Sequence, residues 1–171
     1  MSGGTGSVRV RDLAERFQAA NGELVGFLER LPDPSWHLTC PGEGWTVGVT
    51  AHHVAAAYPA HMRIFQAIAD GSPPPTLRWR DLDEINTRHA AQFAGCGKQE
   101  TLDLLSERAE VVAGSLRVLT DEQLGRRGSF IDRLPSLTVA EWIEMVLIGH
   151  VEMHLASIRE AAGPGAPRAR S

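Results

Sequence analysis

Two histidines near the C-terminus, His150 and His154, have a spacing that lets both bind one metal ion. They stand in the order His-Val-Glu-Met-His, inside a long segment of helical periodicity. Four residues turn a helix through about 400°, so the two rings project from one side, one turn apart. Ile143, Leu147 and Ile158 continue the same apolar stripe, which predicts that both rings point into the protein interior.

Buried imidazoles need polar partners, because an unpaired polar group in the interior is costly. A shared metal ion is one partner; the alternative is a pair of core histidines bonded to carbonyl groups or a carboxylate. The pattern differs from the H-E-x-x-H motif of thermolysin-like peptidases, since Val151 stands where that motif has glutamate. Glu152 is expected on the solvent side, so we exclude that class of peptidase.

A metal site of this kind needs a third ligand. An earlier helical segment offers His52, His53 and His61. Helical periodicity predicts that His52 faces away from the interior, and it leaves His53 and His61 as competing candidates.

The elements that must position these residues are predicted to be helices, because no long segment alternates like a strand. Four long amphipathic segments predict an all-α four-helix bundle, with one short extra helix between the second and third. Helical segments are expected at 13–31, 46–70, 81–94, 102–119 and 138–163, with a brief turn after Thr120 and a loop over 125–137. Thr46, Thr120 and Thr138 are the predicted N-caps.

Length and composition indicate one ordinary globular domain of 171 residues, 43% of them hydrophobic. We expect a flexible N-terminus over 1–7, the bundle over 8–162 and a disordered tail over 163–171. No run approaches the roughly 18 apolar residues of a membrane span, and no signal peptide is evident, so a cytoplasmic location is expected. The net charge of −4 argues against a nucleic-acid partner.

Several other residues are candidates for the site. Tyr58, the only tyrosine, is a candidate catalytic proton donor, with core packing of a hydrogen-bonded hydroxyl as the alternative. Asn86 and His89 lie three residues apart on the short helix and are candidates to bind a cofactor or substrate at the pocket mouth. Pro59 removes the helical partner of the Ala55 carbonyl, so it is expected to kink the helix or to be a tolerated bend.

Two further features are expected to be structural. Trp79, between two arginines, is predicted to be an anchor packed under arginine stems, with a clamp for an anionic substrate as the alternative. Cys40 has no histidine placed beside it by the sequence and is predicted to be buried rather than nucleophilic.

The sequence resembles the DinB-like superfamily of metal-binding four-helix bundles. The family pattern is a Trp-Ser/Thr pair that opens the second helix, followed by a ligand histidine and an aliphatic residue. In this chain the pattern is Trp45-Thr46 followed by His53-Val54, and the late H-x-x-x-H supplies the other two histidines. The resemblance therefore implies a site of His53, His150 and His154, which would be both metal ligands and catalytic residues.

The resemblance also implies an activity. Related proteins include mycothiol-dependent maleylpyruvate isomerases and bacillithiol transferases. We therefore expect one divalent metal, with zinc favoured and nickel or iron possible, and mycothiol as a cosubstrate for S-transfer to, or isomerisation of, a small electrophile. Two alternatives are a protein that sequesters a small molecule in the bundle and a metal-dependent hydrolase or cyclase. Related bundles often pair, so a homodimer is expected.

Overall fold

The computed structural model describes residues 7–164. The predicted flexible N-terminus and disordered tail lie outside these residues, except for Ser7 and for residues 163 and 164. The elements are, in order, α1 (Val8–Arg30), the 3₁₀ turn η1 (Asp33–His37), α2 (Val47–Ala69), α3 (Trp79–Gln92), α4 (Lys98–Arg117), α5 (Asp121–Gly125), β1 (Arg127–Gly128), β2 (Leu137–Thr138), α6 (Val139–Trp142), the π-helical turn η2 (Ile143–Ile148) and α7 (Gly149–Ala162).

The helices begin where the sequence provides capping side chains. Thr46 accepts a hydrogen bond from the Val49 amide, and Thr120 and Thr138 form complete capping boxes, as predicted. Ser7 caps α1 in the same way through the Val10 amide. These caps fix where α2, which contains His53, and the continuous helix that leads to His150 and His154 begin.

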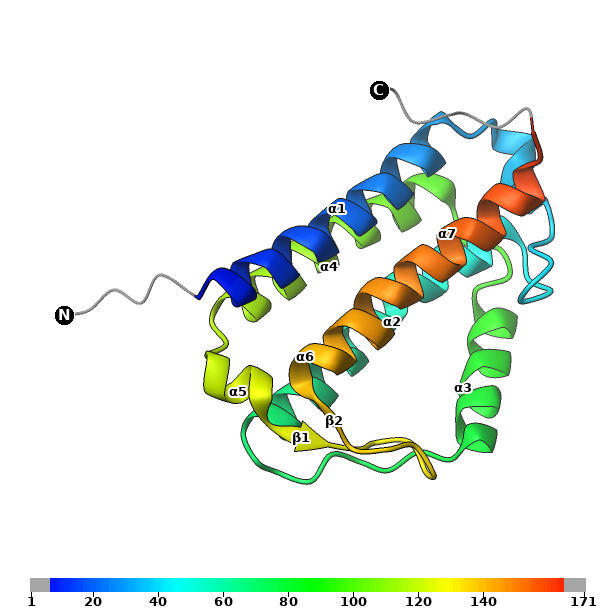
Figure 1. The fold of residues 1–171 in the computed structure, drawn as a ribbon. Coiled ribbons are helices and arrows are strands. Elements are labelled where there is room, and N and C mark those ends of the chain that lie inside the picture. The colour runs from blue at the N-terminus through cyan, green and yellow to red at the C-terminus, as the bar shows by residue number, and fades with distance from the viewer. Residues whose placement is uncertain (1–6, 165–171) are drawn as a thin grey trace.

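The bundle consists of α1, α2, α4 and the continuous helix formed by α6, η2 and α7 (Figure 1). The core between them contains fully buried Phe17, Leu24, Leu105 and Trp142. The predicted all-α four-helix bundle, with a short extra helix between the second and third, is confirmed. Within the described residues, no helix is long and apolar enough to cross a membrane.

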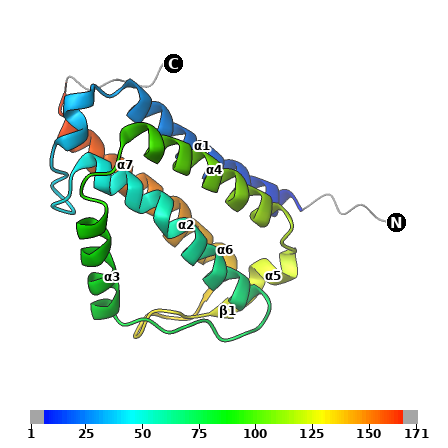
Figure 2. The same ribbon diagram turned by 180° about the vertical axis from the view of Figure 1, so that it is seen from behind.

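The short helix α3 stands apart from the bundle, connected to α2 by an extended segment and to α4 by a short turn (Figures 1 and 2). None of its residues is fully buried. It lies beside α2. One wall of the space between the two helices is therefore α3, which has few contacts with the core.

The segment 125–137 is not the simple loop that we predicted. Its ends pair as the antiparallel strands β1 and β2, with Arg127 opposite Thr138. The ribbon is attached to α6, because the Trp142 indole donates a hydrogen bond to the Gly128 carbonyl at 2.9 Å. Leu77, in the connector after α2, also bonds to the ribbon loop through the Phe130 carbonyl. The two segments together close one end of the space between α2 and α3.

The proline inside α2 leaves one carbonyl without its helical donor. Pro59 lacks an amide hydrogen, which frees the Ala55 carbonyl in the helix interior. The Arg108 guanidinium of α4 donates to that oxygen at 3.0 Å. A neighbouring helix thus supplies the hydrogen bond that the proline removes.

Candidate metal centre

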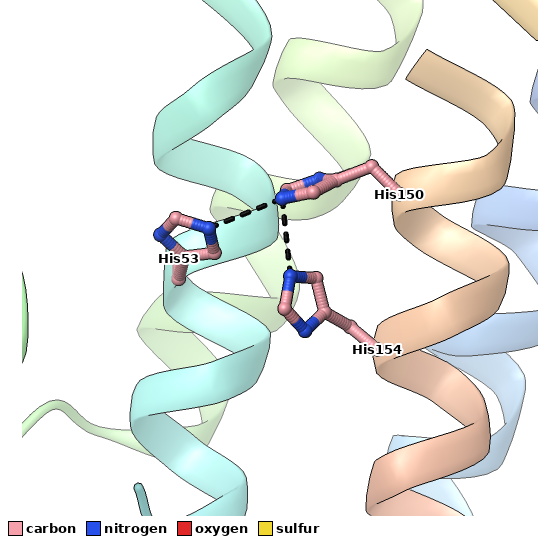
Figure 3. Close-up of side chains that lie close together, drawn as sticks. All are labelled: His53, His150 and His154. Carbon is pink, nitrogen blue, oxygen red and sulfur yellow. Dashed lines mark hydrogen bonds between the residues drawn. The ribbon is translucent and has the colours of Figure 1, made fainter. Parts of the chain in front are cut away.

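Three histidine side chains converge between α2 and α7 (Figure 3). The Nε2 atom of His150 lies 3.1 Å from Nε2 of His53 and 3.0 Å from Nε2 of His154. One nitrogen from each ring lies within 4.8 Å of the other two. The sequence left His53 and His61 as competitors for the third position, and the geometry places His53 in this cluster.

The cluster has the chemistry of a metal site with an open position. Imidazole nitrogens bind zinc at about 2.0–2.1 Å, so two such nitrogens on a tetrahedral ion lie about 3.3 Å apart. The two separations from His150, 3.0 and 3.1 Å, are close to this value, and the third pair, His53 and His154, lies within 4.8 Å. Burial lowers the pKa of His53 to about 3 and also lowers the pKa of His150 and His154, so all three rings are neutral near pH 7. Neutral rings keep the lone pairs that a metal requires.

A carboxylate fixes the orientation of one ring. Glu43 Oε1 lies 2.6 Å from Nδ1 of His154, and its other oxygen accepts a hydrogen bond from Ser157 at 2.5 Å. A carboxylate only accepts, so Nδ1 of His154 carries the proton and Nε2 presents its lone pair to the cluster. Among the described residues, the corresponding Nδ1 of His150 is buried without a hydrogen-bond partner.

Sequence reasoning missed Glu43. It lies in the loop before α2, 111 residues from its partner, and nothing in the local sequence distinguishes it from other surface acids. Two backbone features place it: the bridge between Thr39 and Thr46, and the positive φ of Gly44. Only the folded chain brings the loop over α7.

A π-helical turn precedes the two ligand candidates of the last helix. The Gly149 amide bonds to the Glu144 carbonyl, five residues back, in place of the usual four. A π turn inserts one extra residue, which rotates the following helix relative to the preceding one. Ile143 and Leu147 before the turn are fully buried, and His154 after it is also buried. The turn therefore allows both segments to face the interior.

The cluster lies where two cavities meet. One is a pocket of about 370 Å³, lined mostly by apolar side chains of α2, α3 and the ribbon loop. The other is a polar groove lined by Glu43, Trp45, Thr87, Met153 and His154, among others. The two cavities share four lining residues, which are His53, His150, Asp83 and Asn86. A ligand in either cavity can therefore reach the open side of the cluster.

The structure also places the predicted pocket-mouth residues. Asn86 and His89 both line the apolar pocket, and Asn86 lines the groove as well. His52 does not face away from the interior as we predicted. It is buried under α3, where its ring stacks on Phe93 at 3.9 Å and its Nδ1 lies 3.3 Å from Nε2 of His89. The prediction failed because α3 covers a face of α2 that a simple bundle would leave exposed.

Tyr58 lies in the core rather than at the cluster. Its hydroxyl donates to Asn21 Oδ1 at 2.7 Å, and its ring packs edge-on against Phe17. Burial raises the pKa of this hydroxyl far above its usual range, and Tyr58 lines neither cavity at the cluster. The prediction of a catalytic proton donor is therefore corrected, and the core-packing alternative describes this residue.

Two other predictions have opposite outcomes. Trp79 is not a packed anchor, because its side chain is 56% exposed at the edge of the apolar pocket, while Arg78 pairs with Asp81. Cys40 is fully buried, as predicted, and burial raises the pKa of its thiol. The cysteine is therefore not activated as a nucleophile.

The fold and the cluster together define a helical-bundle protein with a candidate metal centre of three histidines. The chain belongs to the DinB superfamily, whose sequence model matches residues 16–158. No curated protein matches the sequence.

Solved structures share the fold at low sequence identity. YfiT from Bacillus subtilis, described as a probable metal-dependent hydrolase with an unusual four-helix bundle topology, is 20% identical with a TM-score of 0.75 over 95% of this chain and 90% of its own. A mycothiol-dependent maleylpyruvate isomerase is 13% identical with a TM-score of 0.71 over 92% of this chain. This chain spans 62% of the isomerase. At these identities the comparisons establish the fold alone.

Proposed function

We propose that the protein is a metal-dependent enzyme that transfers a low-molecular-weight thiol to a small electrophile, or isomerises the electrophile through a reversible thiol adduct. The observation that supports this proposal most directly is the convergence of three neutral imidazoles at the junction of the two cavities. Three nitrogen ligands leave at least one coordination position for a substrate. Zinc suits such chemistry without redox change, with nickel or iron as alternatives.

The protein side chains supply position and environment. A bound cation would lower the pKa of a thiol or water, which supplies a nucleophile near neutral pH. His53, His150 and His154 would hold the cation, and Glu43 keeps His154 in the required tautomer. The apolar walls of the pocket would surround the body of the electrophile and reduce its contact with water.

The charges around the site argue for a neutral electrophile. No arginine or lysine is among the described residues that line either cavity, while Asp83 lines both and Glu43 lines the groove. Apart from the metal ion itself, a dianion such as maleylpyruvate would find no cationic partner in these walls. We therefore propose an electrophile with a neutral, mainly apolar body. The groove, with carboxylate and amide acceptors beside Trp45, suits a hydroxyl-rich thiol such as mycothiol.

A direct test is to follow thiol consumption by the zinc-loaded protein, with mycothiol and the neutral aromatic electrophile 1-chloro-2,4-dinitrobenzene. We expect turnover above the uncatalysed rate, and loss of that turnover in His53→Ala. His37→Ala is the matched control, because His37 is exposed on η1, away from both cavities. Equal rates in wild type and His53→Ala would contradict metal-assisted thiol chemistry. Cobalt(II) protein gives a second readout, since mycothiol should change its visible spectrum.

The apolar pocket also suits a second function, in which the protein sequesters a small molecule without converting it. A volume of about 370 Å³ is within the range of small-molecule sites. In that case, apolar ligands should bind equally well after removal of the metal, and His53→Ala should retain full affinity. The predicted homodimer stays a prediction, which analytical ultracentrifugation can test.

A further inference from the structure

His61 has a polar side chain that the proposed site does not yet use. It lies on α2, two turns beyond His53, and lines the apolar pocket but not the polar groove. Its ring packs edge-on against His150 with centroids 5.2 Å apart, and lies nearly parallel to the Phe65 ring with centroids 6.1 Å apart. His61 therefore contacts one of the three histidines of the candidate metal centre, on the side of the apolar pocket.

No hydrogen bond satisfies this ring within the described part of the chain. Nδ1 of His61 is buried and has no partner. Nε2 has no hydrogen-bond partner among the described residues either, but it is not one of the fully buried atoms, so it is the nitrogen that a ligand in the pocket can reach. The other histidine in the pocket outside the cluster differs, because His89 is bonded to His52. Burying a polar ring without a partner costs free energy, and such exceptions in a folded protein require an explanation.

The surroundings of His61 show what kind of partner is absent. Apart from the four residues shared with the groove, the residues that line the pocket are aliphatic or aromatic, except for His61 and His89. Ala57, Ala60, Ile64 and Val146 are among the apolar neighbours in this pocket. None of these side chains can hydrogen-bond to His61, so a partner would have to come with the ligand.

We propose that His61 is a substrate-binding residue, whose neutral imidazole donates a hydrogen bond to a carbonyl or ether oxygen on an otherwise apolar substrate. Burying an unpaired lone pair costs less free energy than burying an unpaired N–H. The buried Nδ1 is therefore the unprotonated nitrogen, and Nε2 carries the proton. The substrate class is then a neutral apolar molecule with one acceptor, placed beside the metal centre. This inference rests on the proposed function, because it names the substrate class of the same site.

Two probes of nearly the same shape isolate the hydrogen bond. Acetophenone carries a carbonyl oxygen, and ethylbenzene has a methylene group in its place. Ligand-observed NMR titration of the full-length, metal-loaded protein would give the dissociation constant of each probe. We expect the wild type to prefer the ketone by about fivefold or more, the size expected for one buried hydrogen bond.

Substitutions at His61 test whether this residue causes the preference for acetophenone. His61→Phe keeps a ring against Phe65 and removes both nitrogens, so the two probes should bind with equal affinity. His61→Gln retains a donor and should keep part of the preference, which also covers the case in which the phenylalanine variant does not fold. His37→Phe is the matched control and should bind both probes as the wild type does.

The outcomes separate this inference from the proposed function. Equal affinities in the wild type, no binding of the ketone, or a preference that survives in His61→Phe would overturn the role of His61. Loss of metal from His61→Phe would also overturn it, because His61 would then be a ligand. A wild type that holds no metal but still shows the His61-dependent preference would contradict only the proposed enzyme function.

Discussion

At the scale of single residues, the pair of Glu43 and His154 determines whether three nearby histidines make a metal site or a hydrogen-bonded core cluster. The sequence left both alternatives open, and it named a carboxylate as the partner in the core alternative. The carboxylate is present, but it bonds to Nδ1, the nitrogen that points away from the other two rings. A carboxylate on that nitrogen orients Nε2 toward the cluster, which favours metal binding.

The first prediction concerns this carboxylate. Glu43→Gln removes the charge and weakens the acceptor that fixes the His154 tautomer, so metal affinity should fall by about 10- to 100-fold. Competition with a chromogenic chelator measures the affinity. Glu23→Gln is the control. Glu23 on α1 forms an exposed ion pair with Arg159 of α7, the helix that contains His154. Unchanged affinity in Glu43→Gln would show that the carboxylate has no part in the site.

At the scale of elements, the sequence predicted which helices form the bundle, and their order, better than it predicted contacts between distant segments. Apolar spacing and capping residues located every bundle helix, because these signals are local. The π turn before His150, the β1–β2 ribbon and the cover that α3 gives to His52 depend on contacts between distant segments. Periodicity within one helix contains no information on such contacts. For the same reason, the sequence placed Trp79 in a packed position that the structure leaves half-exposed.

The second prediction concerns the Ala55 carbonyl that Pro59 leaves without its helical donor. Arg108→Met keeps the alkyl stem but removes the donor to the Ala55 carbonyl, so the free energy of unfolding should fall by about 1.5–3 kcal/mol. Pro59→Ala restores an amide at position 59 that can bond to the same carbonyl. In the Pro59→Ala background, loss of Arg108 should therefore cost clearly less. Urea unfolding of the four proteins measures this cycle, and an identical cost in both backgrounds would mean that Arg108 does not compensate for the proline.

At the scale of the whole molecule, buried histidines link stability to pH. Burial lowers the pKa of His53 to about 3 and the pKa values of His61 and His89 to about 4, from an ordinary value of 6.5. Between pH 6.5 and about 4, the unfolded chain binds protons on these residues and the folded chain does not. Stability is therefore fully present above pH 6.5 and is lost as the pH falls through this window.

The third prediction follows for the metal-free protein. Its free energy of unfolding should decrease from pH 7 to pH 5. Below pH 6.5 the slope should approach about 1.4 kcal/mol per pH unit for each of His53 and His61, and less for the more exposed His89. Urea unfolding at several pH values measures the slope. His61→Phe removes one of these histidines and should make the slope shallower, whereas His37→Phe should leave it unchanged. A stability that does not vary between pH 7 and pH 5 would contradict the neutral, buried state of these rings.

As with the fold, some residues of the candidate site could be predicted from the sequence and others could not. His150 and His154 follow from four-residue spacing on one helix, and His53 came from a resemblance carried by its neighbours Trp45 and Thr46. Glu43 and the role of His61 required the folded chain, because each depends on atoms contributed by separate elements.

The central claim is that His53, His150 and His154 bind one metal ion. The most direct test is metal analysis of protein purified without an affinity tag or metal column, with the wild type beside His53→Ala, His150→Ala and the control His37→Ala. The account predicts about one equivalent of metal per chain in the wild type and the control, and none in the two cluster variants. A wild type without metal after reconstitution with zinc, nickel or iron, or cluster variants that keep the full equivalent, would contradict it.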